Sequence, residues 1–347
     1  MEKVSILEQE INEQPEAVRR LLDQEIGPVQ RLAASLQGRF DYVLIAARGT
    51  SDNAARYAQY TFGAYNRLQV ALATPSLFTL YERPPLLTGA LVIGISQSGQ
   101  SPDIGAVVAE GRRQGRPTIA ITNDPASPLA QAAEHVIPIH AGPERAIAAT
   151  KTYTTSLAAL ALFSAALAGD QERTAQLQRL PELMQQTLAD LTPVMARAER
   201  YRYMGHCAVI GRGYNFATAF EIALKIKELT RIVAEPYSSA DFRHGPIAMV
   251  GQGFPVLVVA PSDTVLDDVR GLVADLKGLG AELLLISEDE AMLGQAQLPL
   301  SLPPNIPEWL TPLVAVLPGQ LFSLALAQAK GLNPDQPAGL KKVTETR

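Results

Sequence analysis

Short apolar runs rich in Val, Ile and Leu alternate along this chain with longer stretches whose apolar residues recur at helical spacing. Such runs predict strands buried on both faces, and the periodic stretches predict the amphipathic helices that cover them. The alternation continues through most of the sequence and therefore predicts an α/β fold with a mainly parallel sheet. Residues 1–37 contain no strand-like run, and we expect a helical lead-in there.

A weak internal duplication divides this pattern into two halves. Residues 41–60 resemble residues 206–225, and each segment predicts a strand, a Gly-containing turn and an amphipathic helix. Residues 90–124 resemble residues 254–289 in the same order, as strand, turn, helix and strand. Two copies of one α/β domain are the simplest account of both similarities.

The duplication sets the expected domain boundaries. We place the first domain at 38–180, the second at 181–330 and a C-terminal tail at 331–347. The stretch from Ser156 to Leu191 is helical in period, and we expect it to bridge the halves.

Composition then narrows the class of protein. With 347 residues, 47% of them hydrophobic, the chain can bury the cores of two domains. Its net charge of -5 supplies no basic stripe for nucleic acid. The charged first residues predict no signal peptide, and no uninterrupted apolar run approaches the roughly 18 residues of a membrane span. A single cysteine, Cys207, fits a buried hydrophobic role in a reducing cytoplasm.

The stretch "GISQSGQSPD", residues 94–103, follows a strand-like run with three serines, Ser96, Ser98 and Ser101. A loop between a strand end and a helix start offers backbone N–H groups and the positive end of the helix dipole to an anion. Neither G-x-x-x-x-G-K-[ST] nor G-x-G-x-x-G occurs, so a phosphate monoester is favoured over a nucleotide. The alternative is that Ser101 only caps the following helix.

A second hydroxyl-bearing turn strengthens the case for a phosphate. "RGTSDNAA" places Thr50 and Ser51 at another strand-to-helix junction, and adjacent parallel strands would bring both loops to one carboxyl edge. The second half has "APSDTVLDD" where the first has "SQSGQSPD". We therefore expect phosphate binding in the first domain only.

The segment "FEIALKIKEL" carries its charges in an unusual pattern. Glu221, Lys225 and Glu228 fall on one helical stripe between apolar surfaces. An exposed helix with an ion pair contributing about 0.3 kcal/mol is one interpretation. The other is a partly buried carboxylate whose pKa is raised, so that it exchanges protons near neutrality, as enolisation of a sugar requires.

The histidines do not suggest a metal centre. His135 and His140 are five residues apart, so on one strand they would point to opposite faces, and no Cys or carboxylate cluster accompanies them. We predict no metal and no cofactor. His206 opens a strand and is expected to be structural. His244, in "FRHGP", lies on a predicted turn, and the pattern alone allows either an ordinary loop histidine or a functional one.

Six motifs in order now suggest a family. They are "RGTSDNAA", "SQSGQSPD", "ERAIAATKTYTTSL", "GRGYNFATAFEIALKIKEL", "FRHGP" and "DQPAGLKK". With them the chain resembles, over nearly its whole length, the isomerase half of glutamine-fructose-6-phosphate aminotransferase, which is a pair of sugar isomerase (SIS) domains. The resemblance implies two tandem SIS domains, each a flavodoxin-like parallel sheet between helices, with the tail closing the active site.

The resemblance also implies roles for residues of the binding loops. The phosphate of a ketohexose or amino-sugar 6-phosphate would be held by Ser51, Ser96, Gln97, Ser98 and Ser101, and the turn pattern adds Thr50. Ile147 would contact the sugar through its backbone.

Catalytic roles follow from the same resemblance. Glu228 would move a proton between C1 and C2 through an enolamine or enediol, with Glu221 and Lys225 in the same pocket. His244 would come from the neighbouring subunit of a homodimer and assist ring opening. Lys342 would form an imine with the open-chain ketose. Lys341 stands where the family has a small residue, so which of the two lysines enters the pocket is open.

The family enzyme begins with a glutamine-hydrolysing domain, which we do not find here. We therefore expect interconversion of glucosamine 6-phosphate with fructose 6-phosphate and ammonia without glutamine. The alternatives are a fructosamine-6-phosphate deglycase, and a synthase that uses free ammonia or a separate glutaminase subunit. A non-catalytic sugar-phosphate sensor is disfavoured, because a sensor needs none of Glu228, His244 and Lys342, and the segment before the first strand is too short for a DNA-binding module.

Overall fold

The computed structural model describes residues 4–190 and 196–342, and contacts divide the chain into two compact units. The N-unit contains Gln14–Glu144, Lys151–Pro181 and the tail from Lys341. The C-unit contains the residues before Gln14, the short loop Arg145–Thr150, and Glu182–Leu340. The chain therefore crosses between units within the "ERAIAATK" motif and again in the tail.

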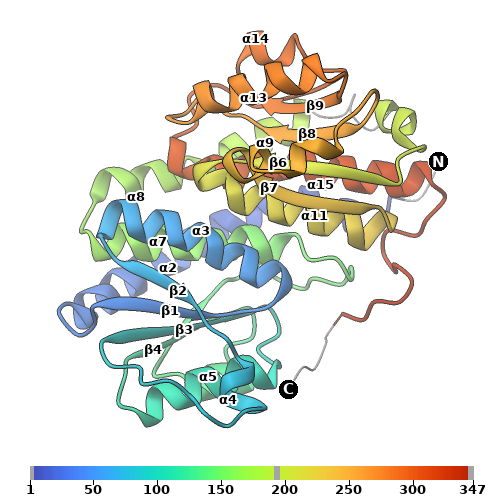
Figure 1. The fold of residues 1–347 in the computed structure, drawn as a ribbon. Coiled ribbons are helices and arrows are strands. Elements are labelled where there is room, and N and C mark those ends of the chain that lie inside the picture. The colour runs from blue at the N-terminus through green and yellow to red at the C-terminus, as the bar shows by residue number, and fades with distance from the viewer. Residues whose placement is uncertain (1–3, 191–195, 343–347) are drawn as a thin grey trace. The chain divides into compact units, whose positions relative to one another are not determined.

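The N-unit is built on a five-stranded sheet whose paired strands are all parallel, in the order β2-β1-β3-β4-β5 (Figure 1). This is the flavodoxin-like order. Every residue of β3 and β4 is buried, which explains why these strands read as continuous apolar runs. The strands are β1 Tyr42–Ala46, β2 Gln69–Leu72, β3 Ala90–Ser96, β4 Thr118–Thr122 and β5 His135–Pro138.

Helices of the N-unit follow the strands as the sequence pattern predicts. After β1 comes α3, after β3 comes α5, and α5 closes one face of the sheet with Ile104, Val107 and Val108. The longer helices are α2 Gln14–Leu36, α3 Gly49–Asn66, α5 Pro102–Arg113, α7 Lys151–Leu167 and α8 Gln171–Gln178, and the short ones are α4 Ser76–Thr79 and α6 Pro128–Ala132.

The helical stretch that we expected to bridge the halves is mostly a core element. Every residue of α7 from Lys151 to Ala165 is buried, and the helix packs against α2 and α3 of its own unit. A helix apolar on all sides belongs inside a domain, because a bridging helix needs a polar face for solvent. Among the helices that the structure describes, α9, Leu180–Asp190, contains the division between the units.

The C-unit repeats the architecture of the N-unit. Its parallel sheet has the order β10-β9-β8-β6-β7, so β6 takes the place of β1 and β8 the place of β3. The internal duplication read from the sequence is thus a duplication of topology. The strands are β6 His206–Gly211, β7 Val233–Ser238, β8 Pro255–Val259, β9 Glu282–Ser287 and β10 Leu298–Ser301.

Helices cover both faces of the second sheet as well. On one face α13 buries Val269, Leu272 and Leu276, while α11 and α15 pack against each other and against the sheet. The α-helices are α1 Ile6–Asn12, α9, α11 Phe216–Thr230, α12 Ser239–Arg243, α13 Leu266–Gly278, α14 Glu290–Leu293 and α15 Thr311–Ala329. Short 3-10 turns are η1 Ala198–Tyr201, η2 Gly213–Asn215, η3 Pro246–Met249 and η4 Glu308–Leu310.

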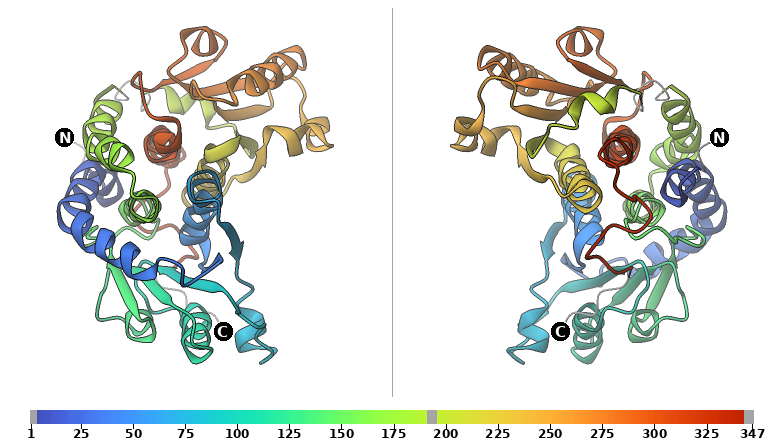
Figure 2. Two further views of the ribbon diagram at one scale, coloured as in Figure 1. Left: turned by 90° about the vertical axis from the view of Figure 1, so that its left-hand side faces the viewer. Right: turned by 90° about the vertical axis from the view of Figure 1, so that its right-hand side faces the viewer.

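One of these helices is unusually apolar. Among residues 4–190 and 196–342, the segment Glu308–Ala329 is long and apolar enough to cross a membrane, although no uninterrupted apolar run marks it in the sequence. All of its apolar window is buried in the folded chain, and α15 is seen end-on as the red helix in Figure 2. It is therefore the core helix of the C-unit.

Candidate active site

The serine-rich loop lies at the carboxyl edge of the N-unit sheet, between β3 and α5. The Ser96 hydroxyl accepts a hydrogen bond from the backbone N–H of Gly99 at 3.1 Å, and the Ser98 hydroxyl accepts one from Gln100 at 3.3 Å. Gly99 has φ of 63°, and a Cβ at this position would collide with Ser127. The loop thus curls tightly, in a backbone conformation that favours glycine.

Ser101 precedes the first turn of α5, but its side chain makes no capping hydrogen bond. The alternative interpretation, in which this serine serves only as a helix cap, therefore lacks its defining contact. At the start of this helix the hydrogen bonds are instead accepted by Asp103. Its side chain is fully buried and accepts hydrogen bonds from the backbone N–H of Ile104 and from Nε of Arg48.

The neighbouring turn after β1 meets the same edge. β1 and β3 are adjacent in the sheet, and Arg48, just before α3, reaches Asp103 at 2.9 Å. This ion pair ties the two loops together at the carboxyl edge, where the order of their strands predicted that the loops would meet. Thr50 and Ser51 lie in the first turn of α3 and are partly exposed.

Together the two loops bring the predicted phosphate-binding residues to one edge. Ser96 is buried, while Gln97, Ser98 and Ser101 are partly exposed. The backbone carbonyl of Gln97 accepts a hydrogen bond from Asn123, which fixes the loop to the end of β4. With the N-termini of α3 and α5 both at this edge, the arrangement has the chemistry of a seat for a small anion.

The matching loop of the C-unit has the opposite character. After β8, Asp263 lies near Glu288 and Glu308, whose side chains accept hydrogen bonds from Ser262 and Thr264. Burial, with a smaller contribution from the nearby carboxylates, raises the pKa of Asp263 to about 6, although a backbone hydrogen bond from Val265 opposes the shift. An acidic loop of this kind repels phosphate, which agrees with the expectation, drawn from "APSDTVLDD", that only the first domain binds one.

The charged stripe on α11 is buried rather than solvated. Nζ of Lys225 lies 2.5 Å from Oε2 of Glu228 and 3.4 Å from Oε1 of Glu221. The side chains of Glu221 and Lys225 are 0% and 1% exposed, while that of Glu228 is 23% exposed. The interpretation as an exposed ion pair is therefore wrong, and Glu228 is the member of the stripe that faces solvent.

Local packing explains why this stripe can be buried. Ile222, Ile226 and Leu229 lie beside it and are themselves buried, and α11 packs on α15 through Ile222 and Gly319. Burying a lysine costs several kcal/mol unless its charge is compensated, and here two carboxylates do so. Such an arrangement is costly for stability alone and is typical of a functional site.

His244 caps the C-terminus of the short helix α12 and is exposed, directly before Gly245, which has φ of 135°, and Pro246. The helix itself is fixed by Ser238, whose hydroxyl accepts a hydrogen bond from the backbone of Asp241, and by the ion pair of Arg243 with Asp268. The histidine is thus presented on a well-anchored turn, and its role across a subunit interface stays a prediction.

The other histidines are not arranged as we assumed. His135 opens β5, but the strand ends at Pro138, so His140 lies beyond it with φ of 48° and bonds Glu25 at 2.8 Å. The opposite-face argument therefore does not apply to this pair. His206 opens β6 and packs on Phe254. Within residues 4–190 and 196–342, no group of three or more His, Cys, Asp or Glu is placed to hold a metal ion.

Cys207 is buried within β6 of the C-unit. Burial raises the pKa of its thiol to about 12. A thiol in this environment is a poor nucleophile, in keeping with the expected role as a small hydrophobic side chain.

The "ERAIAATK" loop is held by a residue that the sequence did not reveal. Oxygens of Glu10, a buried residue of α1, accept hydrogen bonds from the backbone N–H groups of Arg145 and Ala146, at 2.5 and 3.2 Å. Ile147, the predicted sugar contact, follows immediately and is partly exposed. No local pattern could identify Glu10, because its partners are about 135 positions away.

The tail places its two lysines differently. Lys341 is exposed, whereas Nζ of Lys342 lies 3.0 Å from Oε2 of Glu144, and the side chains of Lys342 and Glu144 are 25% and 0% exposed. Earlier in the tail, Asp335 accepts hydrogen bonds from the backbone of Ile6 and Leu7 at the start of α1. Residues 343–347 of the predicted tail lie outside the described residues.

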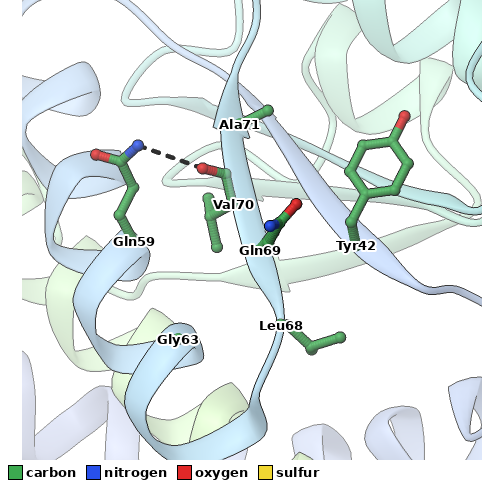
Figure 3. Close-up of a pocket in the computed structure, with 7 residues that line it drawn as sticks. All are labelled: Tyr42, Gln59, Gly63, Leu68, Gln69, Val70 and Ala71. Atoms are coloured by element: carbon green, nitrogen blue, oxygen red, sulfur yellow. Dashed lines mark hydrogen bonds between the residues drawn. The ribbon is translucent and has the colours of Figure 1, made fainter.

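A surface cavity of about 590 Å³ lies elsewhere on the N-unit (Figure 3). Tyr42 and Gln69, the first residues of β1 and β2, face it, so it opens near the amino ends of these strands, away from the serine-rich loop. None of the predicted site residues lines it, and its polar contact from Gln59 to the carbonyl of Val70 is structural. The lining is Tyr42, Gln59, Gly63, Leu68, Gln69, Val70 and Ala71.

Comparison with known proteins agrees with this geometry. A family model of the SIS domain matches residues 41–166 and again 202–329. The chain is 33% identical over 339 residues to glutamine-fructose-6-phosphate aminotransferase of Methanothermobacter thermautotrophicus, covering 96% of this chain and 56% of that relative. It therefore spans little more than half the length of this relative.

Solved structures give the same result. The C-terminal domain of glucosamine-fructose-6-phosphate aminotransferase from Francisella tularensis matches with a TM-score of 0.87 and 28% identity, over 97% of this chain and 99% of that one. A candidate phosphosugar isomerase from Silicibacter pomeroyi DSS-3 matches with a TM-score of 0.86 and 36% identity, over 96% and 100%. The chain thus belongs to the SIS-domain family, as a pair of SIS domains homologous to the isomerase part of glutamine-fructose-6-phosphate aminotransferase.

Proposed function

We propose that this chain is a sugar-phosphate isomerase and deaminase that interconverts glucosamine 6-phosphate with fructose 6-phosphate and ammonia, without glutamine, in the cytoplasm. The buried stripe on α11 carries this proposal. A protein that only senses a sugar phosphate needs an anion seat, but it has no use for a buried lysine that backs a solvent-facing carboxylate.

Binding of the phosphate is assigned to the N-unit. Two strand-to-helix loops, joined by the Arg48–Asp103 ion pair, present hydroxyls and helix N-termini at one sheet edge. A hexose 6-phosphate supplies a dianion of suitable size, and its charge is favoured there by the dipoles of α3 and α5. The assigned residues are Thr50, Ser51, Ser96, Gln97, Ser98 and Ser101, with Ile147 contacting the sugar.

Proton transfer is assigned to Glu228. In the aldose-to-ketose direction its carboxylate takes the proton from C2 and returns it to C1, with an enediol or enolamine between the two steps. A positioned carboxylate of this kind contributes typically 10²- to 10⁴-fold to the rate. Lys225 holds Glu228 in place at 2.5 Å, and Glu221 compensates the remaining lysine charge from behind.

Lys342 and His244 complete the assignment. The ammonium of Lys342 and the carbonyl of the open-chain ketose give a protonated imine and one water, so that atoms and charge balance. His244, exposed at the end of α12, assists ring opening from the second subunit of a homodimer. In this scheme the phosphate is only an anchor, and chemistry occurs at C1 and C2.

Two related reactions use the same groups and differ in the amine that leaves. A deglycase would release an amino compound from a fructosamine 6-phosphate. A synthase would form glucosamine 6-phosphate from fructose 6-phosphate and ammonia, which is either free or delivered by a separate glutaminase subunit. The name of the Methanothermobacter relative favours the synthase as the second candidate function.

The deciding experiment offers the purified chain each substrate in turn. We expect ammonia and fructose 6-phosphate to form from glucosamine 6-phosphate. Turnover of a fructosamine 6-phosphate alone would identify a deglycase, and product formation only from fructose 6-phosphate with ammonium would identify a synthase. Binding of all three sugars without turnover would refute the enzyme and leave a sensor.

A further inference from the structure

The tail lysine is held by Glu144, the first residue of the "ERAIAATK" motif, to which neither the resemblance nor the proposed reaction gave a role. We propose that Glu144 is the positioning residue of Lys342, because it receives the lysine ammonium and thereby fixes the place from which the amine meets the sugar. This inference rests on the proposed function only for the step in which Lys342 attacks a ketose.

Glu144 is oriented before the lysine arrives. Its Oε1 accepts a hydrogen bond from the backbone N–H of Thr152 at 3.1 Å, and its Oε2 accepts one from the Thr152 hydroxyl at 2.8 Å. Both donors lie in the first turn of α7, where a carboxylate is favoured by the helix dipole. The carboxylate therefore has a defined direction that does not depend on the tail.

The backbone just before Glu144 is also held. Nζ of the buried Lys151 donates a hydrogen bond to the carbonyl of Pro143 at 2.7 Å, next to Glu144. Lys342 then approaches Oε2 at 3.0 Å, and the Glu144 side chain is fully buried in this arrangement. Hydrogen bonds between charged groups are the strong ones, and a buried carboxylate is costly without a cation.

The Glu144 carboxylate, here called the lysine seat, also distinguishes between the two adjacent lysines. Lys342 has a side chain three-quarters buried on Glu144, whereas Lys341 is exposed. Both residues and Glu144 belong to the N-unit, the unit that carries the serine-rich loop. The choice between the lysines that the sequence left open is thus made by a buried acceptor.

Amine labelling tests the seat without any substrate. The full chain is treated with limiting acetic anhydride, and acetylation of Lys342 and Lys341 is followed by mass spectrometry. We expect Glu144→Gln to speed labelling of Lys342 by about tenfold or more, because a hydrogen bond between charged groups contributes at least that factor. Lys341 serves as the internal control and should keep its rate.

Thr152→Val is the matched control variant. It removes the hydroxyl that contacts Glu144 but leaves the lysine contact and the backbone N–H in place. Labelling of Lys342 should stay within about twofold of the unaltered chain, since no charged partner is lost. An equal increase in both variants, or none in Glu144→Gln, would overturn the proposal.

A second variant covers the case in which Glu144→Gln fails to fold. Lys342→Ala leaves Glu144 and α7 intact, and we expect lysine-specific proteolysis after Lys341 to accelerate about tenfold as the tail leaves its seat. Unchanged cleavage would mean that the ion pair does not hold the tail, and would refute the seat.

Borohydride reduction separates this inference from the proposed function. With glucosamine 6-phosphate or fructose 6-phosphate present, the imine should be trapped on Lys342 in the unaltered chain and at least about tenfold less in Glu144→Gln. Sugar-phosphate affinity should change little, since the serines are untouched. Selective labelling without any trapped imine would uphold the seat and reject the proposed chemistry.

Discussion

At the scale of single residues, burial decides which charges are available for chemistry. Glu221, Lys225 and Glu228 form one stripe, but only the Glu228 side chain, 23% exposed, faces solvent. The two buried members compensate each other, so removing one would leave an uncompensated charge. A neutral isostere at the exposed end is therefore the cleaner probe of function.

We expect Glu228→Gln to keep sugar-phosphate affinity within about threefold and to lose about 10²-fold or more in turnover, because the proton acceptor is gone while the phosphate seat is untouched. Calorimetric titration and single-turnover kinetics measure the two quantities separately. Lys227→Gln, an exposed change on the same helix, should alter neither. A parallel fall in affinity and turnover would assign Glu228 to binding.

Asp263 provides a test that depends only on stability. Its pKa of about 6 lies above that of an unfolded Asp, so the folded chain binds this proton more tightly. The contribution of Asp263 to stability is therefore present at low pH and is lost as pH rises through 6. Its backbone contact with Val265 would survive in an Asn side chain.

We accordingly expect Asp263→Asn to raise the unfolding temperature at pH 7.5 and to leave it nearly unchanged at pH 4.5, where the native Asp is already protonated. Thermal unfolding by circular dichroism at both pH values is the measurement. Asp267→Asn removes an exposed carboxylate from the same region and should shift stability by no more than about 0.5 kcal/mol at either pH. Equal stabilisation at both pH values would contradict the burial argument.

At the scale of elements, the strand-to-helix loops of the two units differ although their topology is the same. The loop after β3 carries serines and a glycine with positive φ, while the loop after β8 carries Asp263 among carboxylates. The two sheets place these loops at equivalent positions, so the proposed anion seat and the acidic loop differ in their side chains and in the backbone curl at Gly99.

Gly99→Ala tests whether the curl of the serine-rich loop matters. An alanine must adopt φ near 63° and meets Ser127, so we expect binding of a hexose 6-phosphate to weaken by about tenfold or more. Gly105→Ala, within α5, has no atom within 4 Å of the new Cβ and should leave binding unchanged. Equal affinity in the two variants, measured by calorimetry, would exclude the loop from the phosphate site.

At the scale of the whole molecule, the proposed reaction requires two chains. His244 is exposed on an anchored turn, which is suitable for a residue donated to a neighbouring subunit. In a homodimer with shared sites, a subunit altered at Glu228 and a subunit altered at His244 complement each other. One site of the mixed dimer then carries both substitutions, and the other site is intact.

We expect an equal mixture of Glu228→Gln and His244→Ala subunits, exchanged after mild dissociation, to recover roughly a quarter of full activity, since half the dimers are mixed and each has one intact site. Each variant alone should be inactive, and sedimentation should show a dimer. Failure of the mixed sample to recover activity would place His244 in its own subunit's site, whereas an active His244→Ala variant would place it outside the reaction.

The sequence by itself determined the repeated α/β architecture, the positions of the serine-rich loop and the charged stripe, and the family. Each of these is written locally, as a period of burial or as a short motif at a strand end. Tertiary structure alone decided that α7 is a core helix, that the α11 stripe is buried, and that Glu10 holds the backbone of Arg145. It also decided that Lys342 rather than Lys341 reaches Glu144, 198 positions away. Contacts between residues so far apart in the sequence produce no local sequence pattern. They depend on where two folded elements place their side chains, and neither segment's own periodicity contains that information.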